Sequence, residues 1–161
     1  MAPDADEHKM RERGDDEAGL AIMRMWLQRA GIPSLNLALH DGSGLSRLNL
    51  ITPEATARLL VNVSKTAAAS SFRFSLPVAG KDGTLAFRMK AVAGRIAAKT
   101  GSLVYDNALS GYATAEDGEE LAFAIICNDS TGTGNSVVAI DRIALAIAGH
   151  PAPNPQIPSQ K

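Results

Sequence analysis

The sequence predicts an α+β domain, in which helices pack against a short antiparallel sheet. Apolar residues recur at helical spacing within residues 17–30, 52–63 and 137–147. From Gly94 onward, between the second and third of these segments, three strand-like runs follow one another with turn residues between them. Because consecutive strands joined by short turns pair in antiparallel fashion, we expect a meander covered by the helices.

Length and composition limit the chain to one domain, or to part of a larger one. Its 161 residues are 45% hydrophobic but only 4% aromatic, so alanine, leucine, isoleucine and valine must fill the core. The net charge of −1 divides into −4 over residues 1–19 and +3 over the remainder. A net charge this close to zero does not indicate nucleic-acid binding. The mild positive charge of residues 20–161 is compatible with a small anionic substrate.

The cysteine and histidine content predicts neither a metal site nor a cofactor. Cys127 is the single cysteine and lies in an apolar run, so we expect a buried small side chain rather than a nucleophile. His8, His40 and His150 are isolated in sequence, and no pair has metal-ligand spacing. No stretch has the length of a membrane span, and the charged segment 1–19 does not resemble a signal peptide.

The N-terminal part of the chain predicts a tail followed by a helix. Residues 1–16 carry many charges without apolar periodicity, which is typical of a disordered tail. A helix is expected over residues 17–30, and Gly31 is expected to end it. Its methionines and Trp26 are interpreted as core or interface packing.

Two further helices have clear boundaries. Thr52 is expected to cap a helix that has Pro53 at its first position and runs to about Val63. The last helix, over residues 137–147, is followed by a proline-rich tail at 151–161.

The connections between these helices are less regular. Residues 35–39 form a short strand-like run, and the glycine-rich segment 41–47 predicts a tight turn. Residues 64–75 are compatible with a loop or a further short helix. Residues 76–85 predict a loop that lacks the residue order of a phosphate-binding loop.

The three expected strands cover residues 95–104, 108–115 and 120–127. Asp117-Gly118 between the last two predicts a hairpin turn. The third strand is apolar at nearly every position, so we expect both of its faces to be covered.

The segment 98–103, Ala-Lys-Thr-Gly-Ser-Leu, carries the clearest chemical motif and lies in the first strand. The ammonium of Lys99 is a compact, mobile charge that can hold a carboxylate or stabilise an alkoxide. The hydroxyls of Thr100 and Ser102 can donate to a substrate carboxylate. Gly101 has no Cβ, so a substrate backbone can approach the strand closely and pair with it.

Four segments, in this order and spacing, carry a family resemblance: residues 41–47, 76–89, 98–103 and 109–112. They contain Asp-Gly-Ser-Gly-Leu-Ser-Arg, then Leu-Pro-Val-Ala-Gly with Asp-Gly-Thr-Leu and Arg-Met, then the Lys-Thr-Gly segment, then Leu-Ser-Gly-Tyr. The chain resembles the C-terminal part of the D-Ala-D-Ala carboxypeptidase/endopeptidase family, the class C low-molecular-mass penicillin-binding proteins. The resemblance implies that residues 17–150 form the C-terminal part of a serine beta-lactamase/transpeptidase-like fold.

The resemblance also implies a reaction and a site. Family members hydrolyse the terminal D-Ala-D-Ala bond, or peptide cross-links, of peptidoglycan outside the cytoplasm. Lys99 is then expected to be catalytic, by stabilising charge near the nucleophile, while Thr100, Gly101 and Ser102 bind substrate. The implied partners are a peptidoglycan stem peptide or a beta-lactam, with neither metal nor nucleic acid. The 41–47 turn is expected to support the site without a chemical role.

The chain departs from the family pattern because Ser-x-x-Lys, the motif that carries the nucleophile, occurs nowhere in it. Ser34-Leu35-Asn36 spells the second motif, Ser-x-Asn, but it stands directly before the 41–47 turn and is interpreted as coincidence. Tyr105-Asp106-Asn107 follows the triplet and does not fit that role either. Because a serine without a general base is a poor nucleophile, we expect the chain to be inactive alone.

Three functions therefore stay open. The first is a serine-type D-Ala-D-Ala carboxypeptidase/endopeptidase by descent. The second is a non-catalytic module that binds a D-Ala-D-Ala peptide, and the third is half of a split enzyme whose missing N-terminal half carries Ser-x-x-Lys. A truncated reading frame, with residues 1–16 from unrelated sequence, would account for the missing motif and the missing signal peptide together.

Overall fold

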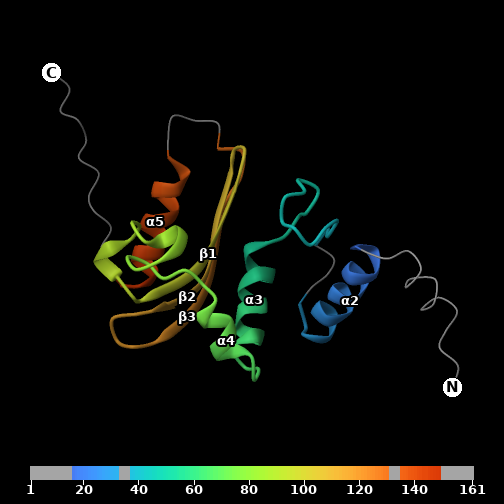
Figure 1. Cartoon of the computed structure of the whole chain (residues 1–161), viewed down its shortest axis with the longest axis horizontal. Coiled ribbons are helices and arrows are strands. Elements are labelled where there is room, and N and C mark those ends of the chain that lie inside the picture. The colour runs from blue at the N-terminus through green and yellow to red at the C-terminus, as the bar shows by residue number, and fades with distance from the viewer. Residues whose placement is uncertain (1–15, 33–36, 131–134, 150–161) are drawn as a thin grey trace, which may run out of the picture.

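The computed structural model describes residues 16–32, 37–130 and 135–149, and the structural statements below concern these segments. Its elements, labelled in Figure 1, are α2 (Asp16–Arg29), α3 (Pro53–Val63), α4 (Ala69–Phe74), the 3₁₀ turns η1 (Gly83–Leu85) and η2 (Lys90–Val92), β1 (Ile96–Leu103), β2 (Asp106–Thr114), β3 (Glu120–Cys127) and α5 (Ser136–Ile147). The predicted 35–39 strand is reduced to a single bridge between Ala38 and Leu50. Residues 64–75, which the sequence left open, contain the short helix α4.

A three-stranded antiparallel sheet in the order β1-β2-β3 lies between α5 on one face and α3 on the other (Figure 1). The strand alternation makes this sandwich possible, because successive side chains point to opposite faces. Ile96 and Ala98 of β1 pack toward α5, whereas Ala97 packs with Leu60 of α3. The α+β class with helices flanking an antiparallel sheet is confirmed.

The larger core lies between the sheet and α5. Its fully buried side chains include Leu85, Val92, Ile96, Leu109 and Ile140. Leu85 and Val92 belong to the long connection between α4 and β1, so this connection contributes side chains to the core and does not lie only on its surface. Cys127 is half-buried and packs against the same cluster.

Gly111 occupies the middle of the sheet, where β2 pairs with Ala98 of β1 and Phe123 of β3. A Cβ atom at position 111 would come within 2.2 Å of the Ala97 carbonyl oxygen and 2.5 Å of the Ala98 Cα. The two strands therefore lie too close together for any side chain larger than hydrogen. The hairpin predicted at Asp117-Gly118 is also present, with Gly118 at a φ of +89°.

The smaller core on the opposite face centres on Tyr112. Its ring packs with Leu60 and Phe72, and its hydroxyl donates to the Leu60 carbonyl at 2.8 Å. Burial raises the pKa of the Tyr112 hydroxyl, and the nearby Arg73 guanidinium opposes this shift. The neutral phenol is thus part of the contact between β2 and α3.

This arrangement predicts a loss of stability at alkaline pH. An unfolded tyrosine ionises near pH 10, so stability contributed by neutral Tyr112 is complete below about pH 10 and is lost as the pH rises through the higher folded pKa. Tyr112→Phe should lower the free energy of unfolding at pH 7 by about 1 kcal/mol, through the lost hydrogen bond. It should also flatten the alkaline decline.

Urea unfolding between pH 7 and 11 measures both effects. Tyr105→Phe is the matched control, because Tyr105 is the other tyrosine of the chain and is 56% exposed. An alkaline decline that is equally steep in Tyr112→Phe and in the parent would show that this hydroxyl is not its source.

Helix α2 ends as its sequence predicts. Gly31 has a φ of +69°, its N–H donates to the Gln28 carbonyl at 3.1 Å, and the Ile32 N–H donates to the Leu27 carbonyl at 3.0 Å. This pair of bonds is a Schellman motif, whose left-handed residue favours glycine. Leu27 and Ile32 pack together with Ala55, which attaches α2 to the start of α3.

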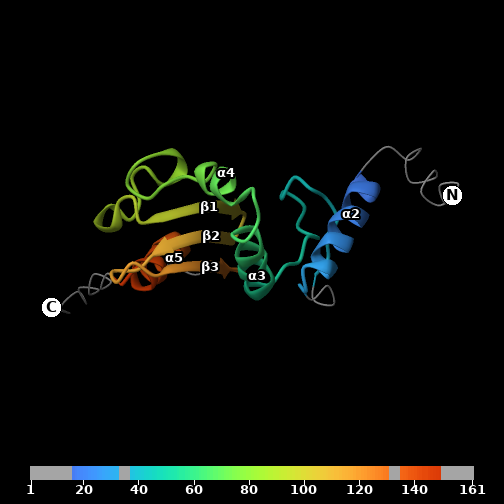
Figure 2. The same ribbon diagram turned by 90° about the horizontal axis from the view of Figure 1, so that it is seen from below.

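The outer side of α2 is exposed, so its methionines and tryptophan do not pack in the core, and the alternative expectation of interface packing stays a prediction. Trp26 is 43% exposed, and Ile22, Met23 and Met25 are more than 40% exposed. Both views place α2 beyond α3, on the side of that helix away from the sheet (Figures 1 and 2). The sheet therefore provides no surface for these side chains to pack against.

Helix α3 begins and ends as predicted. The Thr52 hydroxyl accepts from the Ala55 N–H at 3.1 Å, and Pro53 occupies the first helical position.

Strand β3 has the predicted bounds, and both α3 and α5 contact it. Because β3 is an edge strand, its cover is incomplete, and among the described residues Phe123 is the one buried side chain of this strand. The predicted tails at 1–16 and 151–161 fall almost entirely outside the described residues.

Candidate functional site

The second half of β1 has an open backbone edge. Segment 77–79 pairs with Ile96 and Ala98 through two hydrogen bonds of 2.9 Å. In an antiparallel ladder, alternate residues direct both their N–H and C=O groups to the same side. Thr100 and Ser102 therefore direct their backbone groups away from β2, as Ile96 and Ala98 do. Within the described part of the chain, no strand pairs with this stretch of the edge.

The ammonium of Lys99 lies at this open edge. The side chain is exposed, and its Nζ donates to the Thr100 carbonyl at 2.6 Å. Because the Thr100 carbonyl points away from the sheet at this edge, the ammonium that it binds also lies at the edge. Gly101 is also exposed, and a Cβ atom there would make only an ordinary 3.5 Å contact with Ala108. Packing within the sheet does not require glycine at position 101.

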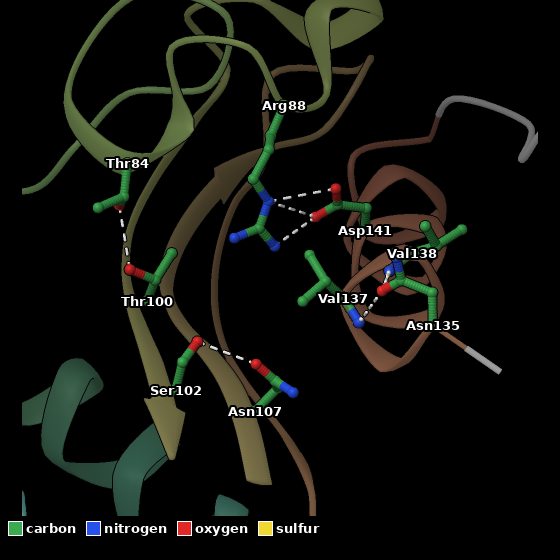
Figure 3. A network of polar contacts seen from close by, with 9 residues as sticks. All are labelled: Thr84, Arg88, Thr100, Ser102, Asn107, Asn135, Val137, Val138 and Asp141. Atoms are coloured by element: carbon green, nitrogen blue, oxygen red, sulfur yellow. Dashed lines mark hydrogen bonds and ion pairs between the residues drawn. The ribbon is translucent and has the colours of Figure 1, made fainter. Parts of the chain in front are cut away.

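Thr100 and Ser102 direct their side chains to the α5 face, and each hydroxyl has a partner (Figure 3). The Thr100 hydroxyl donates to the Thr84 hydroxyl at 3.0 Å. The Ser102 hydroxyl donates to the Asn107 amide oxygen at 2.9 Å, and the Asn107 amide nitrogen donates to the Ser136 hydroxyl at 2.8 Å. The strand alternation thus places Thr100 and Ser102 on the face that α5 covers, and Lys99 and Gly101 on the opposite face. All four residues lie along the same open edge of the sheet.

The loop that carries Thr84 has a fixed shape. Gly80 and Gly83 have φ values of +67° and +51°, and Cβ atoms there would press on Ala93 and Pro77. The Asp82 carboxylate accepts from the Val78 N–H at 2.7 Å. With Leu85 fully buried directly after it, Thr84 is held on an ordered turn beside β1.

An ion pair joins the same loop region to α5. Arg88 and Asp141 form a bidentate contact, with Nη2 to Oδ1 at 2.6 Å and Nε to both carboxylate oxygens at 3.1 and 3.2 Å (Figure 3). Their side chains are 21% and 20% exposed. Arg88 follows the Thr84 turn closely in sequence, so the pair connects this part of the chain to the helix that covers the sheet.

The 41–47 turn supports the far end of β1. Asp41 accepts from the Asn49 amide at 2.7 Å and from the Ser43 hydroxyl at 3.0 Å. The Asn49 hydrogen bond is the main reason that the pKa of the Asp41 carboxyl is lowered. Arg47 then donates to the Val104 carbonyl and lies 3.6 Å from the Asp106 carboxylate, in the connection between β1 and β2.

The described residues contain no group of three or more histidine, cysteine or carboxylate side chains arranged for a metal ion. In the same segments, no helix combines the length and the apolar character needed to cross a membrane. Ser34-Leu35-Asn36 lies outside the described residues.

Residues 7–147 match the family described as the D-Ala-D-Ala carboxypeptidase 3 (S13) family. The chain belongs to this family. The match begins at residue 7, within the segment for which the sequence predicts a charged tail. The predicted resemblance is thereby confirmed.

Curated members of the family are similar to this chain over only part of their length. The D-alanyl-D-alanine carboxypeptidase of Actinomadura sp. (strain R39) is 41% identical over 150 residues, which cover 87% of this chain and 28% of that protein. The D-alanyl-D-alanine carboxypeptidase DacB of Haemophilus influenzae is 36% identical over 121 residues, covering 72% of this chain and 25% of that protein. The chain spans about a quarter of the length of these relatives.

Solved structures of the family have the same fold over this part. Penicillin binding protein 4 of Haemophilus influenzae matches with a TM-score of 0.66 and 34% identity, covering 74% of this chain and 27% of that one. The same protein complexed with a beta-lactam matches with a TM-score of 0.72 and 29% identity, over 83% of this chain and 34% of that one.

Two residues beside the predicted site were missed by the sequence reasoning. Thr84 stands in the Asp-Gly-Thr-Leu segment that carries the resemblance, but nothing in its 16-residue separation from Thr100 indicates their contact. Asn107 belongs to Tyr105-Asp106-Asn107, a segment that does not fit the Ser-x-Asn motif, and its sequence position alone does not indicate a contact with Ser102. The hairpin register from β1 to β2, which aligns Ser102 with Asn107, was the available clue.

Proposed function

We propose that this chain is the C-terminal, peptide-binding part of a serine-type D-Ala-D-Ala carboxypeptidase/endopeptidase that acts on peptidoglycan outside the cytoplasm. The observation that carries the proposal is the open edge of β1 at Thr100 and Ser102, with the ammonium of Lys99 beside it. Family membership supplies the reaction class.

The edge is suited to a peptide that adds as a further strand. Backbone N–H and C=O groups of Thr100 and Ser102 would pair with the peptide, as in other cases of strand addition. The Lys99 ammonium has three N–H donors, of which one is used by the Thr100 carbonyl. The others are available to a terminal carboxylate, and such a charge-assisted hydrogen bond is among the stronger ones. The beta-lactam complex of the Haemophilus influenzae relative supports a beta-lactam as another occupant.

Turnover requires more than this chain contains. The sequence contains no Ser-x-x-Lys, the motif in which a lysine one helical turn away activates the serine. We propose that the chain binds a D-Ala-D-Ala peptide without hydrolysing it when alone. In the complete enzyme, Lys99 would then stabilise the charge that develops near the nucleophile.

A second candidate, completion of a longer or split enzyme, is supported by the other edge of the sheet. Strand β3 ends the described sheet, and its apolar side chains Ala122, Ala124 and Ile126 are only half-buried. An unpaired apolar edge strand favours pairing with further protein. Restoration of penicillin labelling on mixing with a family fragment that carries Ser-x-x-Lys would support this candidate.

The peptide-binding proposal predicts a measurable affinity. Calorimetric titration of the 161-residue chain with an N-acetylated peptide ending in D-Ala-D-Ala should show saturable binding. Lys99→Ala should weaken it about tenfold or more, because a charge-assisted hydrogen bond is lost. Lys65→Ala is the control. Lys65 is exposed, follows the end of α3, and lines the same surface as Gly31 and Arg58, away from the β1 edge.

Two results would contradict the proposal. One is equal affinity in Lys99→Ala and the parent chain, since the charge would then not contact the peptide. The other is a covalent band after incubation with a fluorescent penicillin on a denaturing gel. Such a band would show that a serine of this chain is activated after all.

A further inference from the structure

The outer face of α2 carries a stripe of residues that is largely uncovered in the described part of the chain. Leu20 and Leu27 are buried, so the opposite face of the helix packs on the molecule. The stripe recurs at the spacing of a single helical face, and its members are Ala18, Gly19, Ile22, Met25, Trp26 and Arg29. Because α2 lies beyond α3 and away from the sheet (Figures 1 and 2), another molecule can reach this face.

The stripe is ordered by size, with small residues before Ile22 and large ones after it. Ala18 and Gly19 precede Ile22 by four and three residues, whereas Met25 and Trp26 follow it by three and four. Ile22, Met25 and Trp26 are 64%, 48% and 43% exposed.

Gly19 has no packing reason within the described residues. It is exposed, and beyond its own turn of helix no described atom would lie within 4 Å of a Cβ atom at this position. Glycine inside a helix weakens that helix relative to alanine. The close approach of another backbone is one circumstance that favours glycine.

The order of sizes makes this face complementary to itself. We consider two copies of α2 in antiparallel contact, with Ile22 of each copy on the two-fold axis. Each residue after Ile22 then faces the residue equally far before Ile22 in the other copy. Met25 lies over Gly19, and Trp26 lies over Ala18. Large side chains that face small ones allow two helices to approach closely and interdigitate.

The charges at the two ends of α2 favour the same orientation. Glu17 lies in the first turn and Arg29 in the last, and both are exposed. An antiparallel pair brings Arg29 to the acidic first turn of the other copy, whereas a parallel pair brings like charges together. The two helix dipoles are also opposed in the antiparallel pair.

We propose that this chain forms a symmetric homodimer through the outer face of α2, in antiparallel contact with Ile22 on the two-fold axis. Helix α2 has 14 residues and is about 20 Å long. One pair of such helices is a small interface, so association is weak and reversible, with a Kd on the order of 10 μM. The dimer leaves the β1 edge open and does not depend on the proposed peptide-binding function.

Sedimentation of the 161-residue chain over a range from about 1 to about 200 μM tests the association. The parent should show a monomer–dimer equilibrium. Gly19→Leu places a large side chain where Met25 of the other copy should lie, and should weaken the dimer by about tenfold or more. It should not unfold the monomer, because no described atom opposes the added side chain. Gln28→Leu, at an exposed position of α2 outside the stripe, is the control and should leave the equilibrium unchanged.

Cysteine cross-linking tests the orientation. In a Cys127→Ser background, Ile22→Cys should form a disulfide with its own copy under mild oxidation, because the two residues meet on the axis. Met25→Cys should not link to itself but should link to Gly19→Cys when the two variants are mixed.

Three results would overturn the proposal. One is a chain that stays monomeric over the whole concentration range, including the case in which a family fragment that carries Ser-x-x-Lys covers α2 instead. Another is a dimer that is equally stable in Gly19→Leu and the parent. The third is efficient self-linking of Met25→Cys, which would show a parallel pair.

Discussion

Gly111→Ala is expected to prevent stable folding of the sheet. The added Cβ would lie 2.2 Å from a carbonyl oxygen and 2.5 Å from a Cα atom of β1, and both are backbone atoms that cannot rotate away. Relief requires β1 and β2 to separate where Ala98 pairs with Gly111. We expect a loss of about 3 kcal/mol or more, a large share of the stability of a small domain.

Gly101→Ala is the matched control for this prediction. It adds the same methyl group to the same pair of strands, but the new Cβ would meet Ala108 at an ordinary 3.5 Å. Urea unfolding followed by circular dichroism should show a strongly lowered midpoint for Gly111→Ala and one close to the parent for Gly101→Ala. Similar midpoints for the two variants would mean that the close approach of the strands is not what glycine at 111 provides.

Asp141→Ala is expected to cost about 2–3 kcal/mol of unfolding free energy, because it leaves the partly buried Arg88 guanidinium without its carboxylate. The double variant Arg88→Met with Asp141→Leu should recover much of this loss, since apolar side chains can replace such a pair without leaving a charge unpaired. Denaturant titrations of the two single variants and the double variant measure the coupling.

The exposed ion pair between Glu54 and Arg58 provides the comparison. Its side chains are 68% and 55% exposed, so Glu54→Ala should cost no more than about 0.5 kcal/mol. If Asp141→Ala were equally mild, the Arg88 contact would have no part in holding the Thr84 turn to α5.

Local chemistry made the elements predictable. The strand bounds followed from apolar runs separated by turn residues, and the ends of α2 and α3 followed from Gly31, Thr52 and Pro53, whose backbone and side-chain preferences act within a few residues. The exposure of Trp26 was not predictable in this way. Helical spacing identifies an apolar face, but whether that face is covered depends on what lies beside α2.

The site was predictable only as a stretch of sequence. Lys99, Thr100 and Ser102 were found through their motif, yet their division between two faces and an edge follows from pairing with β2. The contact between Thr100 and Thr84 depends on how the connection between α4 and β1 folds back on the core. Such long-range contacts leave no trace in residue spacing.

The position of Trp26 gives the chain a built-in spectroscopic reporter. It is the single tryptophan, it is 43% exposed, and it stands on the helix most distant from the β1 edge in both views (Figures 1 and 2). The wavelength of its fluorescence maximum therefore responds to a partner that covers α2 and is insensitive to a ligand on β1. A blue shift on adding another polypeptide would report contact at this helix, whereas peptide titrations at the sheet edge would leave the emission unchanged.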